Sequence, residues 1–482
     1  MSEEFHLGRT QPSLDFVDVD TTKDVPVFID PRAIRIQDSS WAADCEALLQ
    51  SFFTEVLEAV RVQNKGRLSE LLGRLGEPNE THLGFSIGRS RGRGLGGVGA
   101  EKVVDTLTHS KAARTGLLSD LEDTSLLIPG IGRDIVSDIT THVIRGALIG
   151  YTQAACDFYG MATVSQHSGP VWNPNSLEWQ EGYVDLPRAG GEEEDKLLLV
   201  PKSIVRHDLI FNKDKYYNGY LAPLLEQEEI QSKTELVRIL KNGSPRVSRI
   251  ELKAKYGADK LAIIEHTAKF PHALPSYRKS TSKLACPPLT HLEVSHLTQT
   301  PEVDYLALMD QVEAISPGNA GASMYHRAVE SLLTALLYPF CSNMKIEAEI
   351  HEGRKRIDIL YDNVAGVGFF DWVARRHGST VLPVECKNYS REPGNEELDQ
   401  ISGRFSRERG WVGIMTCRNF QDKGVFLKRC RDTAKDGRGF VIALDDADLR
   451  ELAEEAQERR NSGLSHQGEF PLLRQRFGHL IN

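Results

Sequence analysis

Hydrophobic and polar positions follow a regular order in the C-terminal third of the chain. Residues 306–315 and 322–337 carry apolar side chains at helical spacing. Two runs with strand character, 345–351 and 356–362, follow and are joined by a short polar turn. This pattern predicts two helices followed by a β-hairpin.

Helices and strands continue to alternate downstream of the hairpin. The pattern predicts helices over residues 369–376, 396–409 and 423–436, and apolar strands over 380–388, 411–417 and 439–444. The βαβ order at the end of this region favours parallel neighbours, whereas the hairpin is antiparallel. We therefore expect an α/β domain whose mixed sheet is flanked by helices.

The first 270 residues show a different pattern, mainly helical at first and then α+β. An amphipathic helix is expected over residues 45–60 and more helix from 134 to 156, with a glycine- and arginine-rich loop over 83–99 between them. Short β-like runs such as 196–205 follow. The predicted organisation is a helical domain over 1–160, an α+β segment with a recognition or regulatory role over 161–270, a Pro-, Ser- and Thr-rich linker over 271–301, the α/β domain over 302–455 and a tail over 456–482.

The composition is that of a soluble protein with a negative net charge. The 482 residues include 58 Lys and Arg against 68 Asp and Glu, a formal charge of −10, and no apolar run approaches the ~20 residues that span a bilayer. The N-terminus lacks a basic and then apolar signal, and the seven cysteines form no CxxC pair. We expect a cytoplasmic protein with no membrane contact, structural zinc or disulfides.

In an acidic chain, any contact with nucleic acid must be local. The segment 404–431 holds eight Lys or Arg against two acids, so Arg404, Arg407 and Arg418 are predicted phosphate contacts. The glycine-rich loop supplies a second candidate set, which consists of Arg89, Arg91 and Arg93.

Three charged residues interrupt the apolar strands of the α/β region. Asp358 lies within one predicted strand, and Glu385 and Lys387 lie two positions apart in another. Residues two apart in a strand point to the same face, so a carboxylate and an ammonium share one site. If the two strands pair, a second carboxylate joins them, and two hard oxygen ligands suit Mg²⁺ or Mn²⁺.

This Asp, then Glu-x-Lys pattern, with the order of elements around it, resembles the PD-(D/E)xK (restriction-endonuclease-like) nuclease superfamily over about residues 305–450. The resemblance implies that Asp358 and Glu385 bind the metal together with the backbone carbonyl of Cys386. It implies that Lys387 orients or activates water, that Glu330 on the first core helix binds a second metal or its water, and that Gln400 lies near the site. Arg404 stands where many members have an aromatic residue, and a segment around 366–378 lengthens the motif.

The resemblance implies a Mg²⁺- or Mn²⁺-dependent endonuclease that hydrolyses phosphodiester bonds of DNA, with RNA left open and prokaryotic defence against foreign DNA as the setting. A homo-oligomer, or a partner protein that controls the nuclease, is also left open. The alternative is a nucleic-acid-binding, assembly or regulatory protein whose nuclease fold is not catalytic. In that case the charges are strand-edge residues or partners in buried ion pairs.

Three further patterns are weaker. The glycines from Gly94 to Gly99 fit a dinucleotide-binding pattern, or a nucleotide-sensing regulator, but no apolar strand precedes them. The residues from Gly84 to Gly88 fit a serine-hydrolase elbow and also lack the strand. Asp134, Asp138 and His142 share a helical face and suit either a metal or, more commonly, helix capping and solvation.

Overall fold

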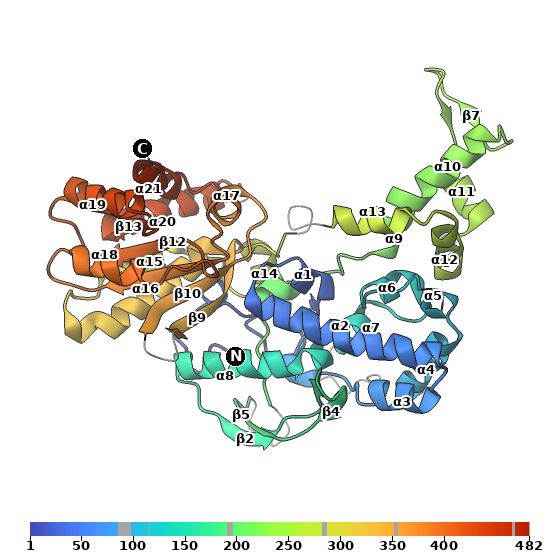
Figure 1. Ribbon diagram of the computed structural model, residues 1–482, viewed down its shortest axis with the longest axis horizontal. Coiled ribbons are helices and arrows are strands. Elements are labelled where there is room, and N and C mark those ends of the chain that lie inside the picture. Colours follow the sequence, from blue (N-terminus) through green and yellow to red (C-terminus); the bar gives the residue numbers. More distant parts are fainter. Residues whose placement is uncertain are drawn as a thin grey trace.

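The computed structural model describes residues 1–84, 98–114, 116–189, 196–281, 287–350, 355–464 and 468–481. The chain has two main hydrophobic cores, one built from residues up to Val294 and one from Val303 onward. Figure 1 shows the second core at the left, around the sheet, and the first at the lower right, around a bundle of helices. No helix in these described ranges is long and apolar enough to cross a membrane.

The C-terminal region is an α/β unit with a five-stranded mixed sheet, as the sequence pattern predicted. The strand order is β13-β12-β11-β10-β9, with the first three strands parallel and the last three antiparallel. The strands are β9 (Cys341–Ile350), β10 (Lys355–Asn363), β11 (Val381–Lys387), β12 (Val412–Cys417) and β13 (Phe440–Asp445).

Helices pack against this sheet. They are α15 (Tyr305–Glu313), α16 (Ala322–Leu337), α17 (Gly368–His377), α18 (Asn395–Ser402), α19 (Lys423–Lys435), α20 (Asp446–Asn461) and α21 (Pro471–Ile481). Helix α16 contacts β9 and β11, and α19, α20 and α21 contact β13. Helix α18 ends at Ser402, earlier than the predicted 409, because Gly403 and the turn after it lead directly into the buried side chains of Arg404 and Phe405.

The N-terminal region is mainly helical, with small two-stranded sheets. Helices α2 (Ser40–Arg61), α7 (Arg133–Val143) and α8 (Arg145–Tyr159) cover the helical segments expected from the sequence. The other described helices are α1 (Pro31–Arg35), α3 (Lys65–Leu72), α4 (Val98–His109), α5 (Lys111–Arg114) and α6 (Asp123–Leu127), and the strands are β1 (Phe28–Ile29), β2 (Val164–His167), β3 (Val171–Asn173), β4 (Glu178–Gln180), β5 (Tyr183–Leu186) and β6 (Val205–Arg206).

The structure corrects three sequence predictions outside the sheet. The β-like run expected over 196–205 is irregular apart from isolated bridges at Lys196 and Pro201, a short helical turn at Lys202–Ile204 and the first residue of β6 at Val205. The expected linker 271–301 contains α13 (Ala273–Ser280) and α14 (His291–Thr298), whose buried side chains belong to the first core. The expected tail 456–482 contains α21, whose Phe477 is buried in the second core.

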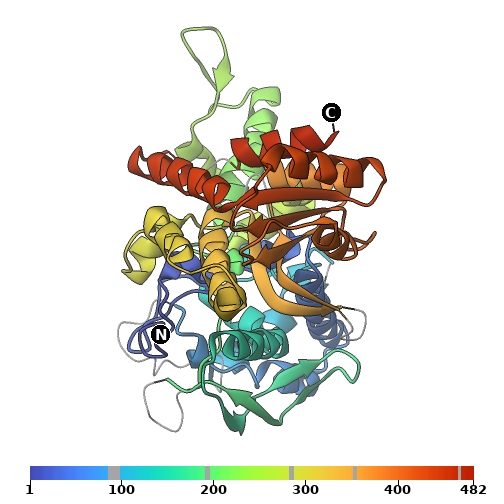
Figure 2. The ribbon, with the colours of Figure 1, turned by 90° about the vertical axis from the view of Figure 1, so that its left-hand side faces the viewer.

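A helical arm projects from the body of the molecule. It runs from α9 (Lys213–Tyr216) through α10 (Ala222–Gln231), α11 (Arg249–Tyr256) and α12 (Lys260–Lys269) to α13. A hairpin of β7 (Arg238–Ile239) and β8 (Pro245–Arg246) forms its tip. Figures 1 and 2 both show this hairpin pointing away from the rest of the chain.

Candidate functional site

The candidate site lies where β10 and β11 separate. Their antiparallel pairing is recorded from Asp362↔Val381 to Ile359↔Val384 and stops there. Just beyond the last pair, the Cys386 backbone N–H donates to Oδ2 of Asp358 at 2.8 Å, a side-chain contact in place of a backbone one. The strands of Asp358 and Glu385 therefore pair, which the sequence had left open, and Asp358 lies just beyond the end of their ladder.

Glu385 is fully buried and held by three donors. Lys387 Nζ donates to Oε2 at 3.0 Å, as expected for side chains two apart on one strand, and Gln400 Nε2 donates to the same oxygen at 3.0 Å. Arg404 Nε donates to Oε1 at 3.1 Å. Lys387 also donates to Gln400 Oε1 at 3.1 Å, which closes a small ring of hydrogen bonds.

The charged side chains of this group change one another's pKa values. Burial and the neighbouring Asp358 carboxylate raise the pKa of Glu385, against the opposing effect of Lys387 and Arg404. Burial lowers the pKa of Lys387, but the Glu385 and Asp358 carboxylates outweigh it, so the pKa lies above its usual value. Lys387 is therefore an ammonium at neutral pH and acts as a positive charge and hydrogen-bond donor, not as a base.

Glu330 is also buried, but it is held by a different partner. Arg9, near the N-terminus, places Nη1 2.5 Å from Glu330 Oε2, and Thr334 Oγ1 donates to Oε1 at 3.0 Å. The pKa of Glu330 is raised by burial and lowered in part by Arg9. Arg9 also stacks on the rings of Phe158 and Tyr159, at 5.7 and 5.3 Å from their centroids. The Glu330 carboxylate thus lies at the junction between the two regions, bound by Arg9 and Thr334, and the metal role that the resemblance implied for it stays a prediction.

The carbonyl of Cys386, predicted as a metal ligand, faces His326. His326 Nε2 lies 2.9 Å from this oxygen, from a position on α16 one turn before Glu330. The sequence prediction missed His326, because only the packing of α16 against β11 brings the two together. A helical spacing of four between His326 and Glu330 was the one signal in the sequence.

The carboxylates of Asp358 and Glu385 have the chemistry of ligands for a hard cation. Asp358 keeps one carboxylate oxygen beyond its contact with Cys386 N–H, and Glu385 accepts three donors where a carboxylate has about four lone-pair sites. Mg²⁺ is commonly held by one or two carboxylates, with waters and phosphate completing its shell. Within the described residues, no group of three or more His, Cys, Asp or Glu side chains is arranged to hold a metal ion.

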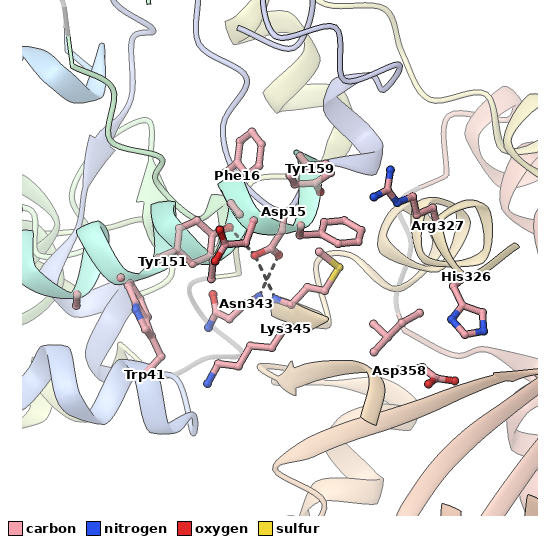
Figure 3. Close-up of a pocket in the computed structure, with 18 of the residues that line it drawn as sticks. Asp15, Phe16, Trp41, Tyr151, Tyr159, His326, Arg327, Asn343, Lys345 and Asp358 are labelled. Atoms are coloured by element: carbon pink, nitrogen blue, oxygen red, sulfur yellow. Dashed lines mark hydrogen bonds between the residues drawn. The ribbon is translucent and has the colours of Figure 1, made fainter. Parts of the chain in front are cut away.

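A cavity of about 620 Å³ opens next to Asp358, between the two regions. Helix α8 forms one wall, and α16, β9 and Asp358 form the other (Figure 3). Arg327 and Lys345, both exposed, line it with Trp41 and Tyr151. The cavity thus combines cations and aromatic rings beside one carboxylate of the site.

The N-terminal segment holds the β9 side of the cavity in place through the buried carboxylate of Asp15. Asp15 accepts from the backbone N–H of Asn343 at 3.0 Å and from the Tyr151 hydroxyl at 2.7 Å. Burial raises the pKa of Asp15, and Lys202 opposes this rise. Burial in turn lowers the pKa of Lys202 to about 7. These contacts tie the start of β9 to the first region, so both regions shape the cavity.

The predicted phosphate contacts fall into three groups. Arg404 is buried on Glu385 and is a site residue, not a surface cation. Arg418 is partly buried, with a side chain that is 8% exposed, and it donates to the Val312 carbonyl at 3.0 Å and pairs with Asp446 at 3.2 Å. Arg407 is exposed, as a phosphate contact requires. The candidates Arg89, Arg91 and Arg93 lie outside the described residues, as do most of the two glycine motifs.

The face of α7 that carries Asp134, Asp138 and His142 is not arranged as a metal site. His142 contacts the Gly76 carbonyl at 2.9 Å and Arg145 Nη2 at 3.0 Å. Burial, and secondarily Arg145, lowers the pKa of His142 to about 4, so the ring is neutral at pH 7. Both ring nitrogens already have protein partners.

Replacing Asp138 by a neutral residue should stabilise the protein to an extent that depends on pH. Burial, with Glu77 and Asp134 nearby, raises its pKa from 3.8 to about 7. The protonated Asp138 carboxyl therefore makes its full contribution to folding stability below about pH 4, and this contribution is lost as the pH rises through about 7. Asp138→Asn should stabilise the protein by on the order of 1 kcal/mol at about pH 8, a value discounted for partial exposure, and by little near pH 5. Thermal melts at both pH values test this, and an equal shift at the two would contradict it.

Comparison with known proteins adds a family match in the N-terminal region only. Residues 6–212 match a family described as Domain of unknown function (DUF8370). The comparisons with curated proteins and with solved structures gave no match. The matched segment includes Arg9, Asp15 and α8 and ends before β9, so it covers one wall of the cavity and none of Asp358, Glu385 and Lys387.

Proposed function

We propose that the chain is a Mg²⁺- or Mn²⁺-dependent endonuclease that hydrolyses phosphodiester bonds of DNA, and that its C-terminal sheet is restriction-endonuclease-like. The observation that carries the proposal is the convergence of Asp358, Glu385 and Lys387 at the point where β10 and β11 separate. The mixed sheet, formed by an antiparallel hairpin followed by parallel strands, also supports it.

Asp358 and Glu385 would hold the cation, which when bound withdraws charge from the scissile phosphate and lowers the pKa of water. The Cys386 N–H orients Asp358, and Gln400 and Arg404 orient Glu385. Lys387 supplies a fixed positive charge where negative charge develops on the phosphate oxygens. Hydrolysis forms one phosphorus–oxygen bond to water and breaks one to a sugar oxygen.

The cavity supplies a path for the substrate beside these residues. Arg327 and Lys345 suit phosphates on either side of the scissile bond, and the aromatic rings of α8 suit an unstacked base. Cutting of foreign DNA in a prokaryotic cytoplasm, under the control of the N-terminal region or of a partner, belongs to the same proposal.

One observation favours the alternative, a nucleic-acid-binding protein whose nuclease fold is not catalytic. Asp358 and Glu385 carry two negative charges, and Lys387 and Arg404 carry two positive charges in the same cluster. The cluster is therefore neutral without a cation, as in a structural ion-pair network.

A cleavage panel separates the two functions and names the polymer. Labelled plasmid, linear duplex, single-stranded DNA and RNA are incubated with Mg²⁺, Mn²⁺ or EDTA. The nuclease proposal expects metal-dependent cutting of DNA. Cutting of RNA alone would show that RNA, and not DNA, is the substrate. Binding of these polymers without cutting, unchanged by Asp358→Ala, would support the alternative.

A further inference from the structure

The hairpin at the tip of the arm is strongly basic in an acidic chain. Residues 238–246 contain three cations, Arg238, Lys241 and Arg246, and no acid, whereas the whole chain has a net charge of −10. The side chains of Arg238 and Arg246 are 72% and 62% exposed. The tip thus presents positive charge to solvent at the end of a projecting element (Figure 2).

The pairing of the two strands places like charges together. Arg238 lies directly opposite Arg246 in the register, and like charges in that position destabilise a strand pair. Arg238 pairs with Glu251, and Arg246 lies 3.7 Å from Glu226. The arginine side chains of both pairs are exposed, whereas Glu226 is buried, and an ion pair with an exposed arginine contributes only about 0–1 kcal/mol. Lys241 forms no ion pair within the described part of the arm. An external anion therefore suits this hairpin.

Exposed aliphatic side chains accompany the cations. Ile239 is 69% exposed and Leu240 46% exposed, both between Arg238 and Lys241. The turn is ordered by hydrogen bonds from Leu240 N to Ser244 O and from Gly243 N to Leu240 O, at 3.0 and 2.9 Å. A two-stranded ribbon with a basic rim and an aliphatic tip combines phosphate contacts with an apolar surface for base edges or base steps.

We propose that the β7–β8 hairpin is a DNA-binding ribbon that enters a groove of duplex DNA, with Arg238, Lys241 and Arg246 on the phosphates. The major groove of B-form DNA admits a two-stranded ribbon, whereas that of A-form RNA is too narrow and deep. This inference deepens the proposed function by naming duplex DNA as the polymer and the arm as a second contact, on a different element from Asp358.

Binding measured without cutting tests the ribbon separately from the nuclease. A short labelled DNA duplex is titrated with protein in EDTA and followed by fluorescence anisotropy at several salt concentrations. The variant R238A/K241A/R246A should bind about tenfold or more weakly near 50 mM salt, and its slope of log affinity against log salt should be smaller by about 2–3. All three positions are exposed, so the melting temperature should stay unchanged.

The matched control removes three exposed cations elsewhere. The variant R61A/K65A/R74A, on α2, α3 and the turn after α3, should bind like the wild type. Equal affinity of R238A/K241A/R246A and this control would overturn the proposal, and so would equal binding of an RNA duplex of the same sequence. Because binding is measured in EDTA and does not depend on cutting, loss of binding in the hairpin variant supports the ribbon even if no cutting is found.

Discussion

Lys387→Ala should lower the rate of metal-dependent cleavage by about 10²–10³ while leaving KM nearly unchanged. Lys387 is an ammonium held by Glu385 and Gln400 at 3.0 and 3.1 Å, so its charge is already in place before the phosphate becomes more negative. A preorganised charge stabilises the transition state more than the bound substrate, and its loss therefore appears in kcat. Single-turnover cleavage at several DNA concentrations measures both constants.

Lys423→Ala is the matched control for this prediction. Lys423 is also an ion-paired lysine of the C-terminal region, with Nζ 2.9 Å from Asp445 and 2.8 Å from Asp448. Its removal tests the general cost of breaking such a pair and should leave the cleavage rate within a few-fold of wild type. Full activity in Lys387→Ala would show that Lys387 takes no part in the cleavage step.

Arg9→Ala should lower the free energy of unfolding by about 3–5 kcal/mol, the largest stability effect expected for a single substitution here. Glu330 is completely buried, and Arg9 is its cationic partner at 2.5 Å. Loss of Arg9 leaves an uncompensated charge at the junction of the two regions and also removes packing on Phe158 and Tyr159. Thermal unfolding followed by circular dichroism measures the change.

Two companion variants identify the cause of this loss. Arg9→Ala combined with Glu330→Gln should be more stable than Arg9→Ala alone, because glutamine needs no counter-charge. Arg61→Ala, at a half-exposed arginine paired with Glu58 at 3.7 Å, should change stability by less than about 0.5 kcal/mol. A double variant no more stable than the single one would show that packing, not the ion pair, carries the effect.

The sheet and its motif strand were predictable from the sequence because their signals are local. Helix α16 has the predicted bounds, and β11 and β12 lie within the predicted 380–388 and 411–417, since apolar runs of this length bounded by polar turns have few alternatives. The shared face of Glu385 and Lys387 follows from the strand period alone. These parts required no knowledge of distant contacts.

The remaining features depend on contacts that no local pattern encodes. Arg9 and Glu330 form an ion pair although most of the chain separates them in sequence. The sequence around Arg404 is that of a surface cation, and only the folded position of β11 shows that Arg404 contacts Glu385. The prediction of a linker over 271–301 also missed contacts with distant residues. A segment rich in Pro, Ser and Thr forms α14 because Thr290 and Glu293 make a capping box and Val294 is buried in the first core.

The central claim, that Asp358 and Glu385 hold a cation with which the chain cuts DNA, is tested most directly on one protein preparation. Mn²⁺ is titrated calorimetrically into the wild type and Asp358→Asn, and the same samples are then assayed for cutting of duplex DNA with Mn²⁺ or EDTA. We expect the wild type to bind Mn²⁺ and to cut only with metal, and Asp358→Asn, which keeps the side-chain shape, to do neither. A wild type that neither binds Mn²⁺ nor cuts, or an Asp358→Asn variant that does both equally well, would contradict the account.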